Sequence, residues 1–247
     1  MEVLAGLQSV REALVAGRRR AVQLWIRTPP PRGAEALASL AEAAGVPVEW
    51  GPHSDLEGRV PGEVRSQGVL LQAEPLPELG LQDARGLAEQ GPALFVALDE
   101  VEDPQNVGAV ARAAEGAGAT ALILTRRRAP RLTAAVSRAS AGAIEHLPVV
   151  RVPNLARSLR ELHELGCWRL GGDAGSEATP LYESPDALWT EPLVLVLGGE
   201  ERGLRPAVVR ELDLRLRIPM RGRVASLNVA TAAAVLLFEA VRRRTKG

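Results

Sequence analysis

Three clusters of residues in the second half of the chain combine residue types and spacings that could do chemistry. In the first, LDEVEDPQNVGAVARAAEGAGA over residues 98–119, Asn106 lies in a turn after an apolar run and Arg112 follows six residues later. A guanidinium binds phosphate through two parallel hydrogen bonds and can stabilise a developing oxyanion. Taken alone, this cluster also fits an N-capping turn followed by a surface arginine, so both interpretations stay open.

The second cluster, LVLVLGGEERGL over residues 193–204, is a glycine-rich turn. Gly198 and Gly199 end a predicted buried strand, so the backbone there can approach a ligand closely. Glu200 follows, and a carboxylate is a poor neighbour for phosphate. Because the G-K-[ST] ending is also missing, the cluster is not a nucleoside triphosphate loop. The alternative interpretation is a tight strand-to-helix turn that binds nothing.

The third cluster, IPMRGRVASLNVATAAAVLLFEAVRRR over residues 218–244, joins the end of a strand to a long helix. Ile218 and Met220 end the predicted strand, and Ser226 and Asn228 precede the apolar helix. Met220 could instead fill the core, and Ser226 or Asn228 could cap the helix. Capping by one of these side chains does not exclude ligand binding at the same turn.

The elements that position these clusters form a predicted α/β domain with a parallel sheet. Apolar runs alternate with helical patterns, and the runs are apolar on both faces, as in a sheet covered by helices on both sides. Ligands of such sheets bind at the carboxyl ends of strands, where all three clusters lie. The sequence predicts strands over 93–98, 121–125, 145–150, 167–171, 193–197 and 214–218, and helices over 106–117, 132–140, 154–165, 207–211 and 228–243.

A smaller α/β unit is predicted in front of this domain. Helical spacing over residues 4–15 precedes a strand-like run, and an alanine-rich helix ends at Gly45. Residues 74–92 carry three prolines and three glycines, which is typical of a linker with room for one short helix. The predicted division is a small domain over 1–73, with strands over 21–26, 46–50 and 68–72 and a helix over 33–44, then a linker over 74–92 and a second domain over 93–247.

The composition excludes a globally basic nucleic-acid-binding protein. The 247 residues include 30 Lys and Arg and 30 Asp and Glu, so the formal net charge is +0, and 46% are hydrophobic, enough for a packed core. RNA binding must therefore come from local clusters of arginine, because Lys246 is the only lysine. Candidate phosphate contacts are the arginine runs 18–20, 126–128 with Arg131, and 242–244, each of which could equally be a solvated charge run.

Cysteine usage and hydropathy argue against further classes of protein. Cys167 is the only cysteine, which excludes an intrachain disulfide, and no Cys/His cluster suggests zinc, so no metal is expected. The longest apolar run, residues 229–238, is far shorter than a membrane span, and the N-terminus resembles an amphipathic helix rather than a signal peptide. We expect a cytoplasmic protein with no membrane and no DNA partner.

Taken together and in order, the three clusters closely resemble the signature motifs of the SpoU/TrmH (SPOUT) family of knotted RNA ribose 2′-O-methyltransferases. The matches are Asn and Arg six apart, then G-x-E-x-x-G-L after a strand, then I-P-M-x-G-x-x-x-S-L-N-V. The resemblance covers residues 93–244 and is closest to the RlmB-like branch, which modifies guanosine in 23S rRNA. Residues 1–73 are similar to the N-terminal domain of that branch, which resembles ribosomal protein L30e, although the family's His-Gln-Gly is Ser66-Gln67-Gly68 here.

The resemblance implies an α/β fold whose C-terminal parallel-sheet domain threads a deep trefoil knot, and a homodimer. It also implies S-adenosylmethionine (SAM) as cofactor, held by Leu197, Gly198, Gly199, Ile218, Met220 and Leu227. The family scheme gives Arg112 the activation of the ribose hydroxyl, with Arg112 and the ribose oriented by Asn106, Glu200, Ser226 and Asn228. Because an arginine stays protonated, we expect Arg112 to stabilise the developing alkoxide and to bind a phosphate rather than to act as a simple base.

The function implied is SAM-dependent methylation of a guanosine ribose 2′-hydroxyl in 23S rRNA, either naked or in a ribosomal precursor. One alternative is a tRNA guanosine ribose 2′-O-methyltransferase, against which the N-terminal domain argues, since the family's tRNA enzymes usually lack it. A second is another rRNA site, as in the thiostrepton-resistance methyltransferases of the same two-domain plan. A third is a non-catalytic RNA-binding protein, against which the joint presence of Asn106, Arg112, Glu200, Ser226 and Asn228 argues.

Overall fold

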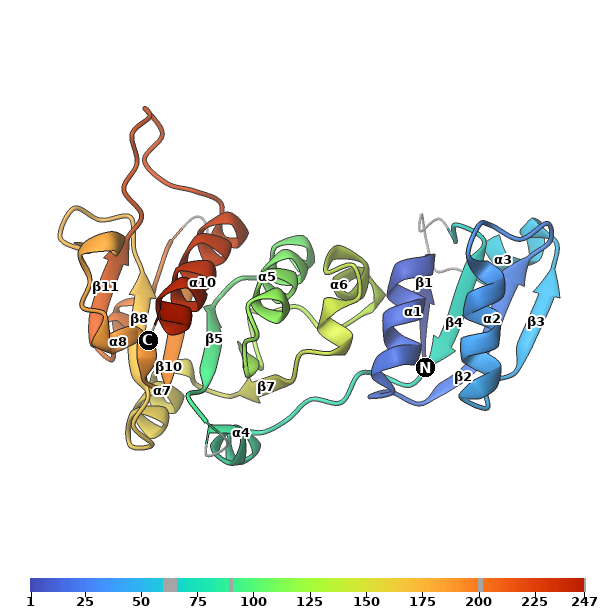
Figure 1. The fold of residues 1–247 in the computed structure, drawn as a ribbon, viewed down its shortest axis with the longest axis horizontal. Coiled ribbons are helices and arrows are strands. Elements are labelled where there is room, and N and C mark those ends of the chain that lie inside the picture. Colours follow the sequence, from blue (N-terminus) through green and yellow to red (C-terminus); the bar gives the residue numbers. More distant parts are fainter. Residues whose placement is uncertain (60–65, 89–90, 200–201, 247) are drawn as a thin grey trace. The chain divides into compact units, whose positions relative to one another are not determined.

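The computed structural model describes residues 1–59, 66–88, 91–199 and 202–246, and the chain divides into two compact units (Figure 1). The first unit comprises residues 1–77 and 131–146, and the second comprises residues 78–130 and 147–247. The two-domain α/β architecture predicted from the sequence is therefore present. The units differ from the predicted division in two respects: residues 74–92 are divided between the two units, and residues 131–146 pack with the first unit although they follow the start of the second in the sequence.

The first unit is built on a four-stranded sheet in the order β1-β4-β2-β3. Strands β1 and β2 are antiparallel to the central β4, whereas β3 runs parallel to β2. Apolar side chains of α1 and α2 pack with the sheet in one core. The elements are β1 (Glu2–Ala5), α1 (Leu7–Ala16), β2 (Ala21–Arg27), α2 (Ala34–Ala43), β3 (Val48–Gly51), α3 (His53–Glu57) and β4 (Val69–Ala73).

The helix predicted from Leu4 is wrong at its start, because residues 2–5 form a strand. Leu4 pairs with Leu71 of β4, and Gly6 turns the chain with a φ of 95°, in the left-handed region that favours glycine. The apolar spacing continues across this turn, since Leu4 and Val10 are buried in the same core. Helical spacing in the sequence therefore could not reveal where the strand ends.

Residues 131–146 are held in the first unit by a buried ion pair. These residues form α6 (Ala134–Ala139) and the 3-10 turn η1 (Ala143–Glu145). Arg19 donates to both carboxylate oxygens of Glu145, with its Nε 2.8 Å and its Nη2 3.1 Å away, and both side chains are 1% exposed. Ser137 adds a hydrogen bond of 2.8 Å to the same carboxylate. The strand predicted over 145–150 is therefore wrong at its start, since Glu145 serves this pair and β7 (Val149–Val152) begins later.

The second unit contains a seven-stranded sheet in the order β7-β6-β5-β10-β8-β11-β9, in which neighbouring strands are parallel. The central strands are almost completely buried, which explains their continuous apolar sequences. The strands are β5 (Leu94–Asp99), β6 (Ala121–Thr125), β7, β8 (Trp168–Gly172), β9 (Thr179–Pro180), β10 (Leu193–Gly198) and β11 (Leu214–Arg217).

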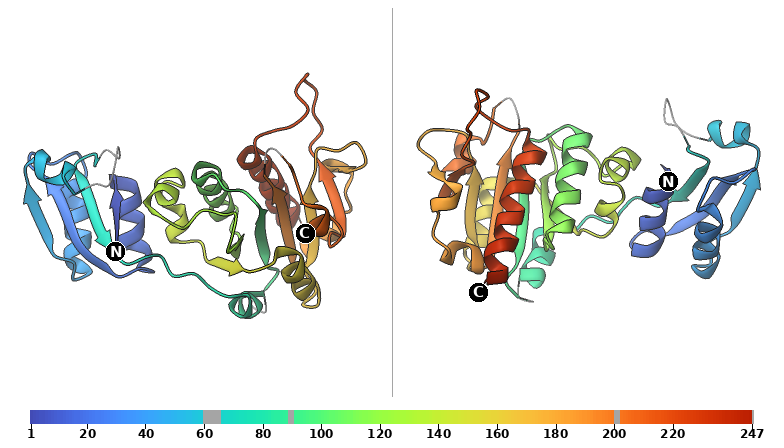
Figure 2. Two further views of the ribbon diagram at one scale, coloured as in Figure 1. Left: turned by 180° about the vertical axis from the view of Figure 1, so that it is seen from behind. Right: turned by 45° about the horizontal axis from the view of Figure 1, so that its top comes forward.

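Helices cover both faces of this sheet. Helices α5 (Pro104–Gly116) and α10 (Val229–Lys246) pack side by side on one face, as Figure 2 shows. Apolar side chains of α4 (Leu81–Ala88), α7 (Leu155–His163) and α9 (Pro206–Val209) form a core with the sheet. The turn η2 (Leu181–Glu183) and α8 (Ala187–Thr190) precede β10. The trefoil knot implied by the family resemblance stays a prediction.

The predicted linker contributes to the second unit. Leu79 pairs with β7, since its N–H donates to the carbonyl of Val149 and its carbonyl accepts from Arg151. Ala84 of α4 is fully buried in the core that contains Phe95 and Leu155. Proline and glycine in this segment indicated an irregular chain, but its few apolar residues suffice to dock the short helix.

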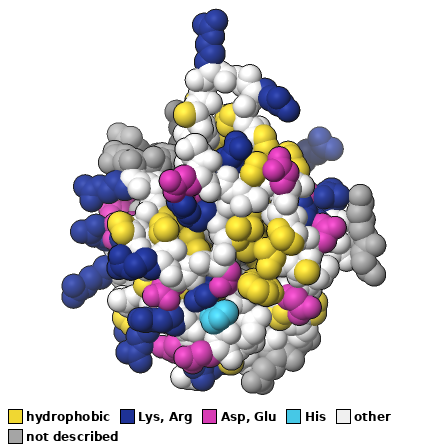
Figure 3. All heavy atoms as spheres, turned by 90° about the vertical axis from the view of Figure 1, so that its left-hand side faces the viewer, with side chains coloured by type: hydrophobic (Ala, Val, Ile, Leu, Met, Phe, Trp, Pro, Cys, Tyr) yellow, Lys and Arg dark blue, Asp and Glu magenta, His cyan; other side chains and the backbone are white. Residues whose placement is uncertain are grey.

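The face of the molecule drawn in Figure 3 carries mixed charge. On it, Lys and Arg side chains are interspersed with Asp and Glu. Within the described residues, no helix has the length and apolar character needed to cross a membrane.

A carboxylate and two arginines fix the C-terminal half of α10. Glu239 accepts hydrogen bonds of 2.7 Å from both Arg242 and Arg243, and Arg243 also donates to the carbonyls of Leu181 and Ser184. Hydrogen bonds from Arg242, with a further contribution from Arg243, lower the pKa of Glu239 to about 2 against the opposing effect of burial. This network ties α10 to the segment before β10.

We predict that Glu239→Gln removes an acid-sensitive part of the stability. A carboxylate whose folded pKa is lowered stabilises the fold above its ordinary pKa of 4.5, and this contribution is lost as the pH falls towards about 2. Between about pH 5 and pH 2, the free energy of unfolding of the wild type should fall by on the order of 2–3 kcal/mol more than that of Glu239→Gln. Urea unfolding across this range measures it, with the exposed Glu164→Gln as control. Equal pH dependence of wild type and Glu239→Gln would contradict the assignment.

Candidate active site

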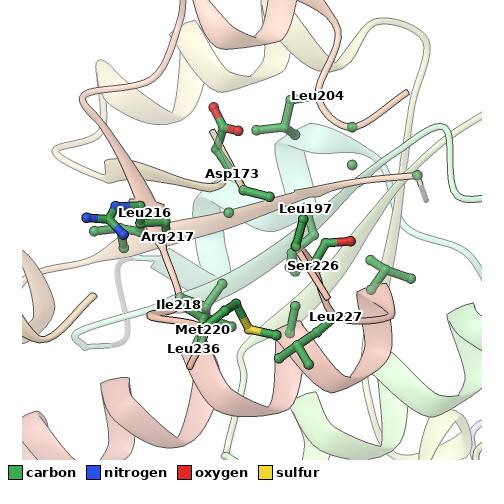
Figure 4. Close-up of a pocket in the computed structure, with 18 residues that line it drawn as sticks. Asp173, Leu197, Leu204, Leu216, Arg217, Ile218, Met220, Ser226, Leu227 and Leu236 are labelled. Atoms are coloured by element: carbon green, nitrogen blue, oxygen red, sulfur yellow. The ribbon is translucent and has the colours of Figure 1, made fainter. Parts of the chain in front are cut away.

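A cavity of about 390 Å³ lies at the carboxyl ends of β8, β10 and β11 in the second unit. Figure 4 shows Met220, Ile218 and Leu236 gathered on one side of it, with Leu197 and Ser226 in the middle and Asp173 towards the other side. This position at strand ends is the usual one for ligands of parallel α/β sheets. The lining residues are Gly172–Ala174, Leu197–Gly199, Gly203, Leu204, Leu216–Ile218, Met220, Ala225–Leu227, Val229, Ala232 and Leu236.

All the residues that the sequence suggested for cofactor binding line this one cavity. Leu197, Gly198 and Gly199 come from the end of β10, and Ile218 and Met220 follow β11. Leu227, the sixth, lies just before α10. The strand order explains this convergence, because β8 lies directly between β10 and β11 and brings their carboxyl ends to the same edge.

The glycines after β10 allow backbone segments to lie against each other without side chains between them. A Cβ on Gly198 would overlap the backbone of Gly203 and Leu204, and one on Gly199 would lie 2.8 Å from the carbonyl oxygen of Glu100. Gly203 donates a hydrogen bond of 2.9 Å to the carbonyl of Gly199 and has a φ of 62°. Gly198 and Gly199 therefore leave no room for a side chain, and the φ of Gly203 lies in the left-handed region that favours glycine.

The sequence interpretation missed Asp173, the acidic residue in the cavity lining. Asp173 follows β8, its Oδ1 accepts from the N–H of Gly175 at 2.8 Å, and its Oδ2 accepts from Arg215 at 3.1 Å. The signal was present as the run Gly-Gly-Asp directly after a predicted strand over 167–171. A polar residue at the carboxyl end of a parallel strand is a candidate for ligand binding even without a motif.

Two of the five suggested catalytic residues form a direct hydrogen bond. The side-chain amide of Asn228 donates to Oδ1 of Asn106 at 3.0 Å, and the Oδ1 of Asn228 accepts from the N–H of Ala230 at 2.9 Å. Asn228 thus caps α10 and also reaches the start of α5, so the capping and the functional interpretations both apply. Ser226 lines the cavity, two residues before Asn228. Glu200 lies outside the described residues.

Within one chain, Arg112 lies on a different side of α5 from the Asn106–Asn228 pair. It follows Asn106 by six positions on α5, a rotation of about 240° around the helix axis. Its side chain is exposed, and within the described parts of the chain it has neither an ion pair nor a hydrogen bond. A guanidinium in this state is available to a group from outside the chain.

A second, more polar cavity of about 610 Å³ adjoins the first. Gly199 and Gly203 line both cavities, and Asn106 lines the second. Its charged lining is organised by ion pairs: Arg205 contacts the buried Asp99 at 2.6 Å and Glu100 at 3.1 Å, and Arg128 contacts Glu100 at 2.8 Å. The remaining lining residues are Val101, Glu102, Asp103 and Arg202.

Other common catalytic devices are not available in the described residues. Cys167 is buried, and burial raises the pKa of its thiol to about 11, so it does not supply a thiolate nucleophile. The described residues hold no group of three or more His, Cys, Asp or Glu side chains arranged to bind a metal ion.

Comparison with known proteins identifies the family. Residues 93–238 match the model of the SpoU rRNA Methylase family, and residues 3–79 match the model for RNA 2′-O ribose methyltransferase substrate binding. The chain is 36% identical to the 23S rRNA (guanosine-2′-O-)-methyltransferase RlmB of Pseudomonas putida, over 99% of this chain and 97% of that protein. It is 42% identical to the RlmB of Xylella fastidiosa, over 83% of this chain and 81% of that protein.

A solved structure has the same fold over nearly the whole chain. It is the AdoMet-bound rRNA methyltransferase from Sinorhizobium meliloti, with a TM-score of 0.78 and 28% identity, covering 98% of this chain and 87% of that one. The SpoU rRNA Methylase model, over residues 93–238, covers the first two motif clusters and residues 218–238 of the third. The chain therefore belongs to the SpoU rRNA Methylase family.

Proposed function

We propose that this protein transfers a methyl group from SAM to the ribose 2′-hydroxyl of a guanosine in 23S rRNA. One observation carries the proposal: the six residues that the motifs suggested for SAM binding line a single cavity, and that cavity adjoins the Asn106–Asn228 pair. The named relatives, which match both units, support 23S rRNA as the substrate. Such a substrate would place the protein in the cytoplasm, which stays a prediction.

The lining of the first cavity fits SAM. Leu197, Ile218, Met220 and Leu227 offer apolar surface for a purine ring, while backbone groups beside Gly198 can approach the ligand closely. Asp173 places a carboxylate in the same lining, where the positive charges of SAM would be stabilised. When bound, SAM supplies a methyl group already activated by the sulfonium.

The protein then has to position the ribose hydroxyl and stabilise the charge that develops on its oxygen. As the new O–C bond forms and the C–S bond breaks, the hydroxyl proton must leave to solvent or a neighbouring base. Because Arg112 remains protonated, it stabilises the developing alkoxide and binds a phosphate. The Asn106–Asn228 pair offers amide groups to orient the ribose.

Two features support a homodimer in which the partner completes the site. Arg112 lies on a different side of α5 from Asn106, so one chain does not bring them together. Phe238 of the neighbouring α10 is 51% exposed, and it lies 4.0 Å from where a Cβ on Gly116 of α5 would be. A second copy packed on α5 and α10 would cover this ring and could bring its own Arg112 to the site.

We predict that Gly198→Ala weakens SAM binding by at least about 10-fold, because the added methyl would force the backbone at Gly203 out of place. Isothermal calorimetry of SAM binding measures this. Gly86→Ala is the matched control, since Gly86 lies on α4 with open space around its Cβ position. If Gly198→Ala binds SAM as tightly as the wild type, the cavity is not the cofactor site.

We predict that Arg112→Ala lowers the rate of methyl transfer by about 100- to 1,000-fold and leaves SAM affinity intact. The test is transfer of labelled methyl from SAM to unmodified 23S rRNA, to ribosomal precursor particles and to unmodified tRNA, with Arg157→Ala as the surface control. Label on rRNA that Arg112→Ala abolishes supports the proposal. Label on tRNA alone would replace the substrate, and SAM binding without label on any RNA would favour a non-catalytic RNA-binding protein.

We predict that Phe238→Asp converts a dimer into a monomer, because a carboxylate cannot be buried without a partner charge. Light scattering coupled to size-exclusion chromatography measures the mass, and Val15→Asp on α1 is the exposed apolar control. If the site is shared, mixing inactive Arg112→Ala with inactive Asn106→Ala should restore part of the methyl transfer. A monomeric wild type that is fully active would refute the shared site.

A further inference from the structure

The second cavity has no role in the function proposed above, yet it shares a wall with the first. Gly199 and Gly203 line both, and no side chain at either position separates them. Asn106, which lines the second cavity, is bonded to Asn228, which lies directly between the cavity-lining Leu227 and Val229. The Asn106–Asn228 pair therefore stands where the two cavities meet.

Among the described residues, equal numbers of positive and negative side chains line the second cavity. Its lining contains three carboxylates, from Glu100, Glu102 and Asp103, and three guanidinium groups, from Arg128, Arg202 and Arg205. A balanced lining favours neither a bare phosphate nor a metal ion, since each would meet as many like charges as opposite ones. It suits a neutral polar molecule with hydrogen-bond donors on one edge and acceptors on another.

Ion pairs hold three of these six charged groups in place. Asp99 and Glu100 end β5, Arg205 follows β10, and Arg128 follows β6, so the chain of contacts Asp99–Arg205–Glu100–Arg128 links the ends of three strands. Glu100 itself is held with a φ of 58°, in the left-handed region that non-glycine residues seldom adopt. The wall of the cavity is therefore preorganised rather than assembled on binding.

Among the described residues that line this cavity, Glu102 is the carboxylate left available. Its side chain is exposed at the cavity, and the described residues provide it with no hydrogen bond or ion pair. Asp103, by contrast, already uses Oδ1 to accept from the N–H of Gln105 at 2.9 Å as the N-cap of α5. An ionised carboxylate with both oxygens open accepts two parallel hydrogen bonds.

We propose that the second cavity takes the guanine base of the target nucleotide and that Glu102 accepts hydrogen bonds from its N1–H and 2-amino group. Those two donors lie side by side on the Watson–Crick edge of guanine, whereas adenine and the pyrimidines do not present this pair. Enzymes that act on single nucleotides read the exposed base in this way. With the base in the second cavity, the ribose falls at the Asn106–Asn228 pair, next to the methyl donor in the first.

This inference rests on the proposed function. Testing two enzymes, wild type and Glu102→Gln, on two RNA substrates distinguishes a failure of the inference from a failure of the proposed function. Inosine differs from guanosine only by lacking the 2-amino group. An rRNA fragment carrying guanosine or inosine at the mapped position is methylated by wild type and by Glu102→Gln. Wild type should prefer guanosine by about 5- to 100-fold in kcat/KM, and Glu102→Gln should bring this preference close to unity, with SAM affinity unchanged.

Two control variants make the result specific to Glu102. Glu115→Gln, an exposed change on α5 away from the cavity lining, should keep the wild-type preference. Glu164→Gln, an exposed change just after α7 and in neither cavity lining, should keep it as well. Methylation with no guanosine preference in wild type, or a preference that Glu102→Gln retains, would overturn the inference while leaving the proposed function intact. Failure of wild type to methylate any rRNA would instead overturn the proposed function, and this inference with it.

Discussion

The close approach of backbone to backbone at the end of β10 is the constraint on which the site depends. Gly198 lies against Gly203, and Gly199 lies against the carbonyl of Glu100, at distances that leave no room for a Cβ. This contact brings Gly199 and Gly203 together, and both residues line the two cavities. A side chain there would have to displace the turn and would disturb both cavities together. The glycines are therefore required for the arrangement of the site, whether or not their own atoms contact a ligand.

Several arginines of this protein stabilise its fold, so they do not contribute to a basic surface. Arg19 is buried against Glu145, and Arg243 joins Glu239 to the carbonyls before α8. Arg244 donates to the carbonyls of Pro92, Ala93, Trp189 and Glu191, so the C-terminal run of arginines is structural. A planar guanidinium with five donors can satisfy several carbonyls at once, which a lysine cannot. Runs of arginine in the sequence therefore overstate the basic surface left for RNA.

The motifs predicted the residues that line the cavity more accurately than periodicity predicted the bounds of the surrounding helices and strands. Six cofactor residues were suggested from two separate clusters, and the parallel strand order brings all of them to one cavity. The strand at Glu2–Ala5 was missed because Leu4 and Val10 face the same core, so a helical spacing runs through both elements. The packing of residues 131–146 with the first unit depends on Arg19 meeting Glu145, two residues 126 positions apart whose pairing no local pattern can show. Local periodicity reports which face is apolar, and it does not report which distant partner covers it.

The positions of Asn106 and Arg112 explain why a motif can be clear in the sequence and incomplete in one chain. Spacing of six on a helix places two side chains on different sides, so they cannot both face the same ligand from the same copy. Asn106 is committed within the chain, through its hydrogen bond to Asn228, whereas Arg112 is exposed. A motif of this kind is satisfied if one residue serves its own cavity and the other serves the cavity of a neighbouring copy. Selection on catalysis would then keep both residues on one helix, because that helix would contribute to two sites at once.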